Sequence, residues 1–217
     1  MPRAVSRGQP AAEEGYRDAV RQLLRDRLLD AARDLLEHRS WGQVTMGQVA
    51  RSAGVSRQTL YNEFGTRDDL GQALVIREAG RFLDAVEEAI DAHADDPLQA
   101  IRAGLQRFLT IATTDPFVRL LLADDGTSGL LPLVTTQSVP VLDWAGEHLA
   151  AAITARWPLA SKSDVRAGAD ALVRLAISHA IAPRDTPARA AATITQLLAP
   201  SIEVMLKPGG TAEERRT

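Results

Sequence analysis

The sequence has no cysteine, and aromatic residues make up only 4% of its 217 positions. Without cysteine the chain has no disulfide framework, thiol nucleophile, zinc ribbon or iron–sulfur cluster. No apolar run approaches the roughly 18 residues that a membrane-spanning helix needs. No apolar stretch follows Arg3 and Arg7, as a signal peptide would require. We therefore expect a cytoplasmic protein of one or two domains that makes no membrane contact.

Signatures of catalysis and of cofactor binding are also missing. The sequence has neither a G-x-S-x-G motif nor a phosphate-binding glycine loop, and its histidines show no H-x-x-x-H or H-x-E spacing. The acidic pairs at residues 95–96 and 124–125 lie in expected loops, where solvated turns are the simpler interpretation. We expect no enzyme activity, no cofactor and no metal.

Neither sign of charge dominates, since the net charge is −3. Its distribution is uneven: residues 1–82 carry 13 arginines and 11 acidic residues, whereas residues 83–217 carry 12 basic and 17 acidic residues. This pattern is expected if only the first part meets a polyanion, although a difference of this size also arises by chance.

Apolar residues recur at helical spacing throughout the chain. The first helix, expected over residues 16–38, has Val20, Leu24, Leu28, Ala31 and Leu35 on one face. Convincing period-2 alternation is absent, so the prediction is an all-α protein of about nine helices. Three of these helices are expected to begin where a capping residue precedes a proline, at Asp96-Pro97, Asp115-Pro116 and Thr186-Pro187.

The most informative stretch is residues 45–70, TMGQVARSAGVSRQTLYNEFGTRDDL. Thr45 and Gln48 form a capping box at the start of one short helix, and Gly54 ends that helix in a left-handed turn. Ser56 then caps a second short helix. The pattern predicts a helix–turn–helix whose second helix enters a DNA major groove, with an ordinary packed helical corner as the alternative. The residues expected to hold the two helices together are Val49, Ala53, Val55, Leu60 and Phe64.

The polar residues outside the second helix match the chemistry of DNA. Arg57 can bond guanine bidentately, Gln58 can bond adenine, and the methyl group of Thr59 can touch thymine. Arg67, at the start of the following helix, would clamp a phosphate together with backbone amides. The predicted DNA-binding residues are Thr45, Ser56, Arg57, Gln58, Thr59, Tyr61, Asn62, Thr66 and Arg67.

This stretch resembles the TetR family of transcriptional regulators, with the pattern T-x-x-x-[IV]-A-x-x-A-G-V-S-x-x-T-[LV]-Y-x-x-F-x-[ST]-[KR]-x-x-L. The resemblance covers about residues 16–72 and includes Trp41 in the turn before the motif. Asn62 stands where many members have His, and Arg67 where Lys is usual; both keep a phosphate-capable donor. The resemblance implies a homodimer that reads a palindromic operator and, as a repressor, releases it when the C-terminal domain binds a small molecule. VSRQTLYNEFG with QALVIREAGRF is most similar to members encoded beside alkane-hydroxylase or lipid genes.

The resemblance implies a ligand-binding cavity in the C-terminal half, although apolar residues at helical spacing more often form an ordinary hydrophobic core. The expected cavity is apolar, and no charged residue is evident that could bind the head group of a ligand. The hypothesis is therefore a hydrophobic effector such as a fatty acid or other long-chain, lipid-like compound. The predicted ligand-binding residues are Phe82, Val86, Leu105, Phe108, Leu121, Trp144, His148, Leu149 and His179.

The last two helices, expected over residues 164–182 and 187–206, are rich in small and aliphatic residues. Two such helices from each protomer can form a four-helix dimer interface, with intrachain packing as the alternative. The predicted interface residues are Ala171, Ala176, Ala180, Ile194, Leu198 and Ile202.

These inferences divide the chain into a disordered arm (1–15), a helix–turn–helix DNA-binding domain (16–66), a ligand-binding and dimerisation domain (67–207) and a disordered tail (208–217). Besides an enzyme, the second alternative function is a helical scaffold or partner-binding protein that uses the helix–turn–helix for protein contacts. Its partners would be proteins, whereas the favoured prediction has double-stranded operator DNA, a small hydrophobic effector and a second copy of the chain as partners.

Overall fold

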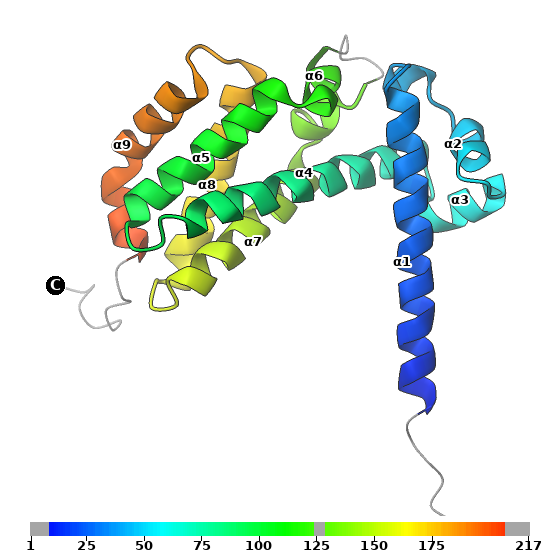
Figure 1. The fold of residues 1–217 in the computed structure, drawn as a ribbon, viewed down its shortest axis with the longest axis horizontal. Helices are drawn as coiled ribbons and strands as arrows, with labels where there is room; N and C mark the ends of the chain where they lie inside the picture. Colours follow the sequence, from blue (N-terminus) through cyan, green and yellow to red (C-terminus); the bar gives the residue numbers. More distant parts are fainter. Residues whose placement is uncertain (1–8, 124–128, 207–217) are drawn as a thin grey trace, which may run out of the picture. The chain divides into compact units, whose positions relative to one another are not determined.

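The structure is a computed structural model that describes residues 9–123 and 129–206. Within those ranges the chain forms nine α-helices and two short 3₁₀ helices and no strand, which confirms the all-α prediction (Figure 1). The elements are α1 (Gln9–Leu36), η1 (Trp41–Gln43), α2 (Met46–Ser52), α3 (Arg57–Phe64), α4 (Arg67–Asp91), α5 (Pro97–Thr114), α6 (Pro116–Ala123), η2 (Leu131–Val134), α7 (Val139–Arg156), α8 (Lys162–Ile181) and α9 (Pro187–Leu206).

The chain divides into two compact units, Met1–Leu74 and Val75–Thr217. The N-terminal unit holds α1, α2, α3 and the first two turns of α4, and the C-terminal unit holds the rest of α4 and all later helices. Helix α4 therefore contributes residues to both units.

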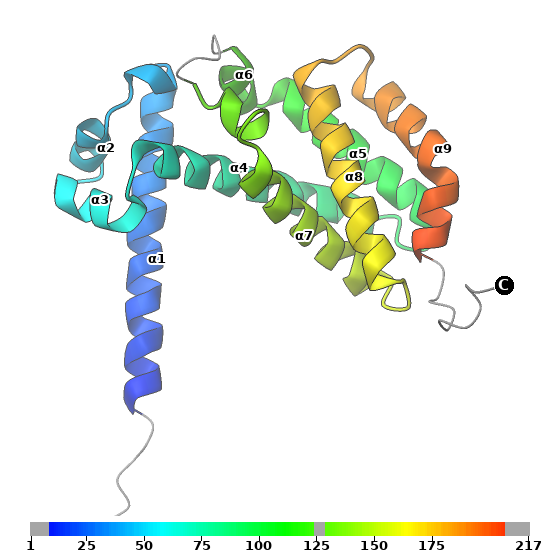
Figure 2. The same cartoon turned by 180° about the vertical axis from the view of Figure 1, so that it is seen from behind.

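Helix α1 begins at Gln9, earlier than the sequence indicated. Residues 9–15 of the expected disordered arm are therefore helical. Pro10 is compatible with this position, because the N–H that proline lacks would have no partner in the first turn of a helix. The rest of that arm, and the expected tail at 208–217, lie outside the described residues. The buried face of α1 is also shorter than predicted: Leu28 and Ala32 are fully buried, but Val20 is 46% exposed. Figures 1 and 2 both show α2 and α3 beside the C-terminal half of α1 only.

The C-terminal unit is a helical bundle in which α5 packs on α9 and α8, and α7 packs on α8 (Figure 2). Small residues set the close approaches in this bundle. A Cβ on Gly104 of α5 would lie 2.9 Å from Ile90 of α4, and one on Gly168 of α8 would lie 2.4 Å from Met205 of α9. An ion pair between Arg156 and Asp91 also joins the end of α7 to the end of α4.

The three predicted helix starts in this unit are confirmed by their capping hydrogen bonds. Asp96 accepts from the backbone N–H of Gln99 at 3.1 Å. Asp115 accepts from the backbone N–H groups of Phe117 and Val118 at 2.8 and 3.2 Å. Thr186 accepts from the N–H of Arg189 at 3.4 Å. These caps fix where α5, α6 and α9 begin.

Candidate DNA-binding surface and ligand cavity

The helix–turn–helix is held by local hydrogen bonds at its helix ends. The Thr45 N–H donates to Gln48 Oε1 at 2.9 Å, and the Gln48 N–H donates to Thr45 Oγ1 at 3.3 Å, so the predicted capping box is present. Ser56 Oγ accepts from the Thr59 N–H at 3.0 Å and caps α3. Gly54, in the turn between the helices, has φ 69°, a conformation that costs other residues free energy. The predicted packing residues Val49, Ala53, Leu60 and Phe64 are buried, and Val55 is half-buried.

A second reciprocal cap begins α4. The Thr66 N–H donates to Asp69 Oδ2 at 3.0 Å, and the Asp69 N–H donates to Thr66 Oγ1 at 3.1 Å. The Thr66 hydroxyl also donates to the carboxylate at 2.6 Å, and these hydrogen bonds hold the pKa of Asp69 below its ordinary value. The predicted DNA-binding residues Thr45, Ser56 and Thr66 thus cap helices in the structure.

The surface of α3 presents five of the predicted DNA-binding side chains. Arg57, Gln58, Tyr61 and Asn62 are exposed, and Thr59 is half-buried. The Gln58 amide donates from Nε2 to Asn62 Oδ1 at 2.8 Å, which fixes the two amides relative to one another. The guanidinium of Arg57 lies over Gly47, since a Cβ there would be 2.6 Å from its Nε. We define these four exposed residues as the α3 face.

Arg67, the first residue of α4, is already engaged within the protein. Its guanidinium donates from Nη2 to the backbone oxygen of Trp41 and lies 5.0 Å from the centre of the Trp41 ring. Trp41 itself is buried. Arg67 therefore fixes the start of α4 against the 3₁₀ turn, a structural role that the sequence did not indicate.

Glu63 of α3 joins this helix to α1, a role that the sequence did not indicate. Its carboxylate accepts from Arg21 Nε at 2.9 Å and from Arg25 Nη1 at 3.2 Å, both on α1. Arg25 also lies over the Phe64 ring, 4.5 Å from its centre. These contacts attach α3 to α1 along the side opposite the α3 face. Two arginines spaced four residues apart on the first helix were the available signal.

The C-terminal unit contains a cavity of about 140 Å³. Its wall comes from α4, α5, α6, η2, α7 and α8, so residues more than a hundred positions apart in the chain meet around it. Six of the nine residues predicted to bind ligand lie in this wall: Phe82, Val86, Leu105, Phe108, Leu121 and Leu149.

The three polar or amphipathic residues of that prediction lie elsewhere. Trp144 stacks on His148 with ring centres 4.1 Å apart, and the His148 Nδ1 pairs with the Trp144 backbone oxygen at 2.9 Å. His148 is exposed. His179 is half-buried and is not in the wall of the cavity. These three residues lie outside the wall of this cavity, which is formed by aliphatic residues, phenylalanines and Glu78.

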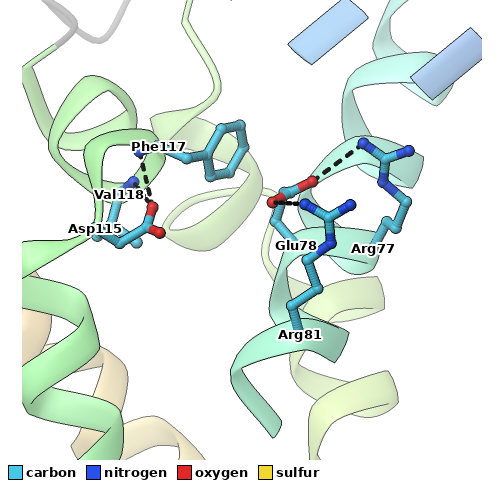
Figure 3. A network of polar contacts seen from close by, with 6 residues as sticks. All are labelled: Arg77, Glu78, Arg81, Asp115, Phe117 and Val118. Carbon is cyan, nitrogen blue, oxygen red and sulfur yellow. Dashed lines mark hydrogen bonds and ion pairs between the residues drawn. The ribbon is translucent and has the colours of Figure 1, made fainter. Parts of the chain in front are cut away.

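A charged residue, Glu78 of α4, lies in the wall although the sequence indicated no charged anchor. Its side chain is 1% exposed, and it pairs with Arg77 at 3.1 Å and with Arg81 at 3.4 Å. Figure 3 shows both guanidinium groups at the carboxylate, and the ring of Phe117 pointing toward it from α6. In the sequence, Arg77 and Glu78 are typical of a solvated helix face, so only the tertiary packing shows that Glu78 is buried in the cavity wall.

The predicted interface residues divide between the surface and the interior. Ala176, Ile194 and Ile202 are buried within the protomer. Ala180 lies in the cavity wall and Leu198 packs on the core. Ala171 is exposed. The outer faces of α8 and α9 instead expose Leu175, Leu197 and Val204.

In residues 9–123 and 129–206, no helix is long and apolar enough to cross a bilayer. Within the same residues, no group of three or more potential ligand side chains is arranged to hold a metal ion.

The fold and the α3 face together define a helix–turn–helix protein with a helical C-terminal unit that contains a largely apolar cavity. Family models match both parts: "Bacterial regulatory proteins, tetR family" over residues 28–74, and "Bacterial Tetracyclin repressor, C-terminal domain" over residues 96–200. The chain belongs to the TetR family of transcriptional regulators. It is therefore a DNA-binding regulator and not an enzyme.

Named relatives agree with this assignment. The HTH-type transcriptional regulator AlkX of Mycobacterium tuberculosis is 39% identical over 194 residues, which span 89% of this chain and 92% of that protein. The crystal structure of the TetR family repressor AlkX from Dietzia sp. strain DQ12-45-1b, implicated in biodegradation of n-alkanes, is 34% identical with a TM-score of 0.72, covering 84% of this chain and 97% of that one. The repressor QsdR of R. erythropolis shares the fold at 19% identity, with a TM-score of 0.65 over 87% of this chain and 99% of that one.

Proposed function

We propose that the protein is a repressor that binds a palindromic operator as a homodimer and releases it when a hydrophobic small molecule enters the C-terminal cavity. The observation that carries the DNA-binding part is the α3 face: four exposed polar side chains on a helix fixed by caps at Thr45 and Ser56 and by the Glu63 ion pairs. A side chain reads bases only if its helix is held rigidly, and these contacts supply that rigidity.

The cavity supports a hydrophobic effector. Its volume of about 140 Å³ is similar to that of apolar cavities of roughly 150 Å³ that bind benzene. A longer aliphatic chain must widen it, so the wall helices would have to move. The likeness to two AlkX regulators, one of them implicated in n-alkane biodegradation, favours an aliphatic, lipid-like compound.

Helix α4 gives a route from ligand to DNA. It supplies Val75 to Ile90 of the cavity wall and also the capped start at Thr66 and Arg67 in the N-terminal unit. A ligand that widens the cavity favours a different position of α4, and only such differential affinity shifts the population away from the DNA-binding form. A tenfold loss of operator affinity needs about 1.4 kcal/mol of coupling.

The outer faces of α8 and α9 support the homodimer. Leu197 and Val204 are 76% and 58% exposed, and they are separated by two helical turns on α9. Ala171 and Leu175 are exposed one turn apart on α8. Exposed aliphatic residues in such rows are typical of a surface that a second protomer covers.

The test is binding to the DNA upstream of the protein's own gene, measured by fluorescence anisotropy over a salt series and against a scrambled duplex. A specific regulator prefers the native duplex by about 10³-fold or more, and its affinity falls steeply with salt. Selection from genome-wide fragments covers a distant operator. If no fragment is selected, the proposal of a specific palindromic operator fails.

A further inference from the structure

We infer that the cavity selects its ligand by length: it takes one unbranched alkyl chain of about twelve carbons, laid along α4 and bounded at both ends. This inference rests on the proposed effector site and adds the size and shape of the compound that the site accepts. Two observations carry it: the rows that the wall residues form along their helices, and the side chains that meet at each end of the cavity.

The wall residues of α4 form one continuous row. They recur at steps of three and four residues from Val75 to Ile90, so they share one face of the helix. The wall residues of α5 form a similar row from Ile101 to Ala112. Such rows border an elongated cavity, because their successive members lie one helical turn apart.

One end of the cavity lies where α4 and α5 are in close contact. A Cβ on Gly104 would be 2.9 Å from Ile90 and 3.3 Å from Val86, so the two helices pack tightly there. Ile101, one turn before Gly104 on α5, is buried, and so is Ile90. An alkyl chain that has reached these side chains cannot extend further.

The opposite end of the cavity lies at α6. The Phe117 N–H donates to Asp115 at 2.8 Å, and the Phe117 ring points toward Glu78 of α4 (Figure 3). Phe117 and Glu78 both belong to the wall, and both are buried. The cavity is therefore bounded at this end as well.

The distance between the two ends sets the length of the ligand. Glu78 and Ile90 lie twelve residues apart on α4, which is about 18 Å at the rise of an α-helix. An extended alkyl chain advances about 1.25 Å per carbon, so about twelve carbons, with the radii of the terminal atoms, fill that distance. A volume of about 140 Å³ spread over this length is narrow throughout. An unbranched chain therefore widens the cavity less than a ring with the same number of carbons.

A series of 1-alkanols with six, eight, ten, twelve and fourteen carbons tests the inference, with the full-length protein titrated calorimetrically into each alcohol. These probes share one small head group and differ only in chain length. We expect the affinity to rise about fourfold per added methylene up to about twelve carbons, and then to stop rising or to fall. A rise that continues unchanged to fourteen carbons would overturn the inference, and so would a maximum below ten carbons.

Cyclododecanol is the control for shape, since it has as many carbons as 1-dodecanol but cannot extend. It should bind about tenfold or more weakly than 1-dodecanol, because it has to force the wall apart. Equal affinity for the two alcohols would refute the elongated shape and the inference with it.

Two variants at the end formed by α4 and α5 should move the length limit in opposite directions. Gly104→Ala adds a methyl group to the wall where Ile90 must also shift, so 1-dodecanol should lose about fourfold or more in affinity relative to 1-octanol. Ile90→Val removes one methyl group from the same end, so 1-tetradecanol should gain affinity relative to 1-dodecanol. Gly146→Ala is the matched control, because Gly146 lies outside the cavity wall and its Cβ would be 3.9 Å from the Cα of Asp170. It should keep the wild-type order.

The outcomes distinguish this inference from the proposed function. A series without a length limit overturns the inference but leaves a hydrophobic effector in place, whereas no binding of any alcohol defeats both. A limit that stays at the wild-type length in both G104A and I90V would also overturn the inference. If G104A fails to fold, the wild-type series and I90V decide.

Discussion

The two units of the chain present their functional residues in opposite ways. The N-terminal unit buries a small apolar core and turns polar side chains outward on α3, whereas the C-terminal unit turns aliphatic side chains inward around a cavity with one buried carboxylate. Contacts close in sequence fix the first arrangement, since Thr45 pairs with Gln48 and Thr66 with Asp69. The second arrangement depends on helices distant in sequence.

The difference has a physical consequence. A surface that reads DNA must keep one geometry, and the short-range caps supply most of it, together with the ion pairs between Glu63 and α1. A cavity that responds to a ligand must have an alternative packing of similar free energy. We therefore expect substitutions in the two units to differ in kind: those in the N-terminal unit change stability or DNA affinity directly, and those around the cavity change ligand selection and coupling.

The largest expected effect comes from the core of the N-terminal unit. Leu60 of α3 is fully buried, so Leu60→Ala should lower the free energy of unfolding by about 2–5 kcal/mol and abolish DNA binding. Chemical denaturation followed by circular dichroism measures the change. A loss below about 1 kcal/mol would show that this unit is not tightly packed.

The next effect concerns the outer face of α9. Leu197→Glu places a charge on the most exposed aliphatic residue of the proposed interface, so it should convert the dimer to a monomer at micromolar concentration. Light scattering coupled to size-exclusion chromatography gives the mass. Gln196→Glu, an exposed neighbour, is the matched control. A dimeric L197E protein would place the interface elsewhere.

Arg57 tests the α3 face without disturbing the core. Arg57→Ala should weaken operator binding by about 1–3 kcal/mol, as expected for the loss of a bidentate contact to a base, and leave the unfolding free energy within about 0.5 kcal/mol of wild type. Anisotropy titrations measure the affinity. Arg102→Ala, at an exposed position of α5, should leave it unchanged. Equal losses in both variants would point to a general charge effect.

Substitutions at two glycines test the role of local backbone conformation. Gly65, which ends α3, has φ 76°, so Gly65→Ala should cost about 1–2 kcal/mol. Gly15 lies in α1 with open space around its Cα, so Gly15→Ala should stabilise the protein by up to about 1 kcal/mol. Thermal unfolding compares the two variants. The same sign of change in both would contradict the conformational explanation.

The smallest effect is electrostatic. The Thr66 hydroxyl is the main cause of the lowered pKa of Asp69, so Thr66→Ala should raise that pKa toward its ordinary value. Because a lowered carboxyl pKa stabilises the folded state above the ordinary pKa and loses that effect as the pH falls through the folded value, the variant should lose less stability on acidification in this range. An NMR titration of the Asp69 carboxyl group tests this. An unchanged pKa would assign the shift to another group.

The N-terminal unit was largely predictable because its signals are local. The residues that cap α2 and α3, and the glycine at 54, lie within four positions of the groups they act on. The exceptions are long-range: Glu63 pairs with Arg21, 42 positions away, and Arg67 contacts the backbone of Trp41, 26 positions away. A periodic pattern within one helix cannot show which distant helix it will meet.

The C-terminal unit was less predictable for the same reason. Helical spacing indicated which apolar residues share one face of a helix, and six of the residues predicted to bind ligand line the cavity. Spacing does not separate a cavity wall from a core or from an interface. Ala176 illustrates the limit: its small side chain favoured an interface, whereas the packing of α8 places it in the wall. Glu78 shows the converse, a charged residue that only tertiary structure buries.

One titration tests the central claim, that ligand in the cavity controls the α3 face. Operator affinity is measured by anisotropy with increasing amounts of a straight-chain hydrophobic compound that calorimetry shows to bind, up to the concentration that saturates the cavity. The account predicts at least a tenfold loss of operator affinity at saturation, corresponding to about 1.4 kcal/mol of coupling. An operator affinity that stays constant while the cavity fills would contradict it.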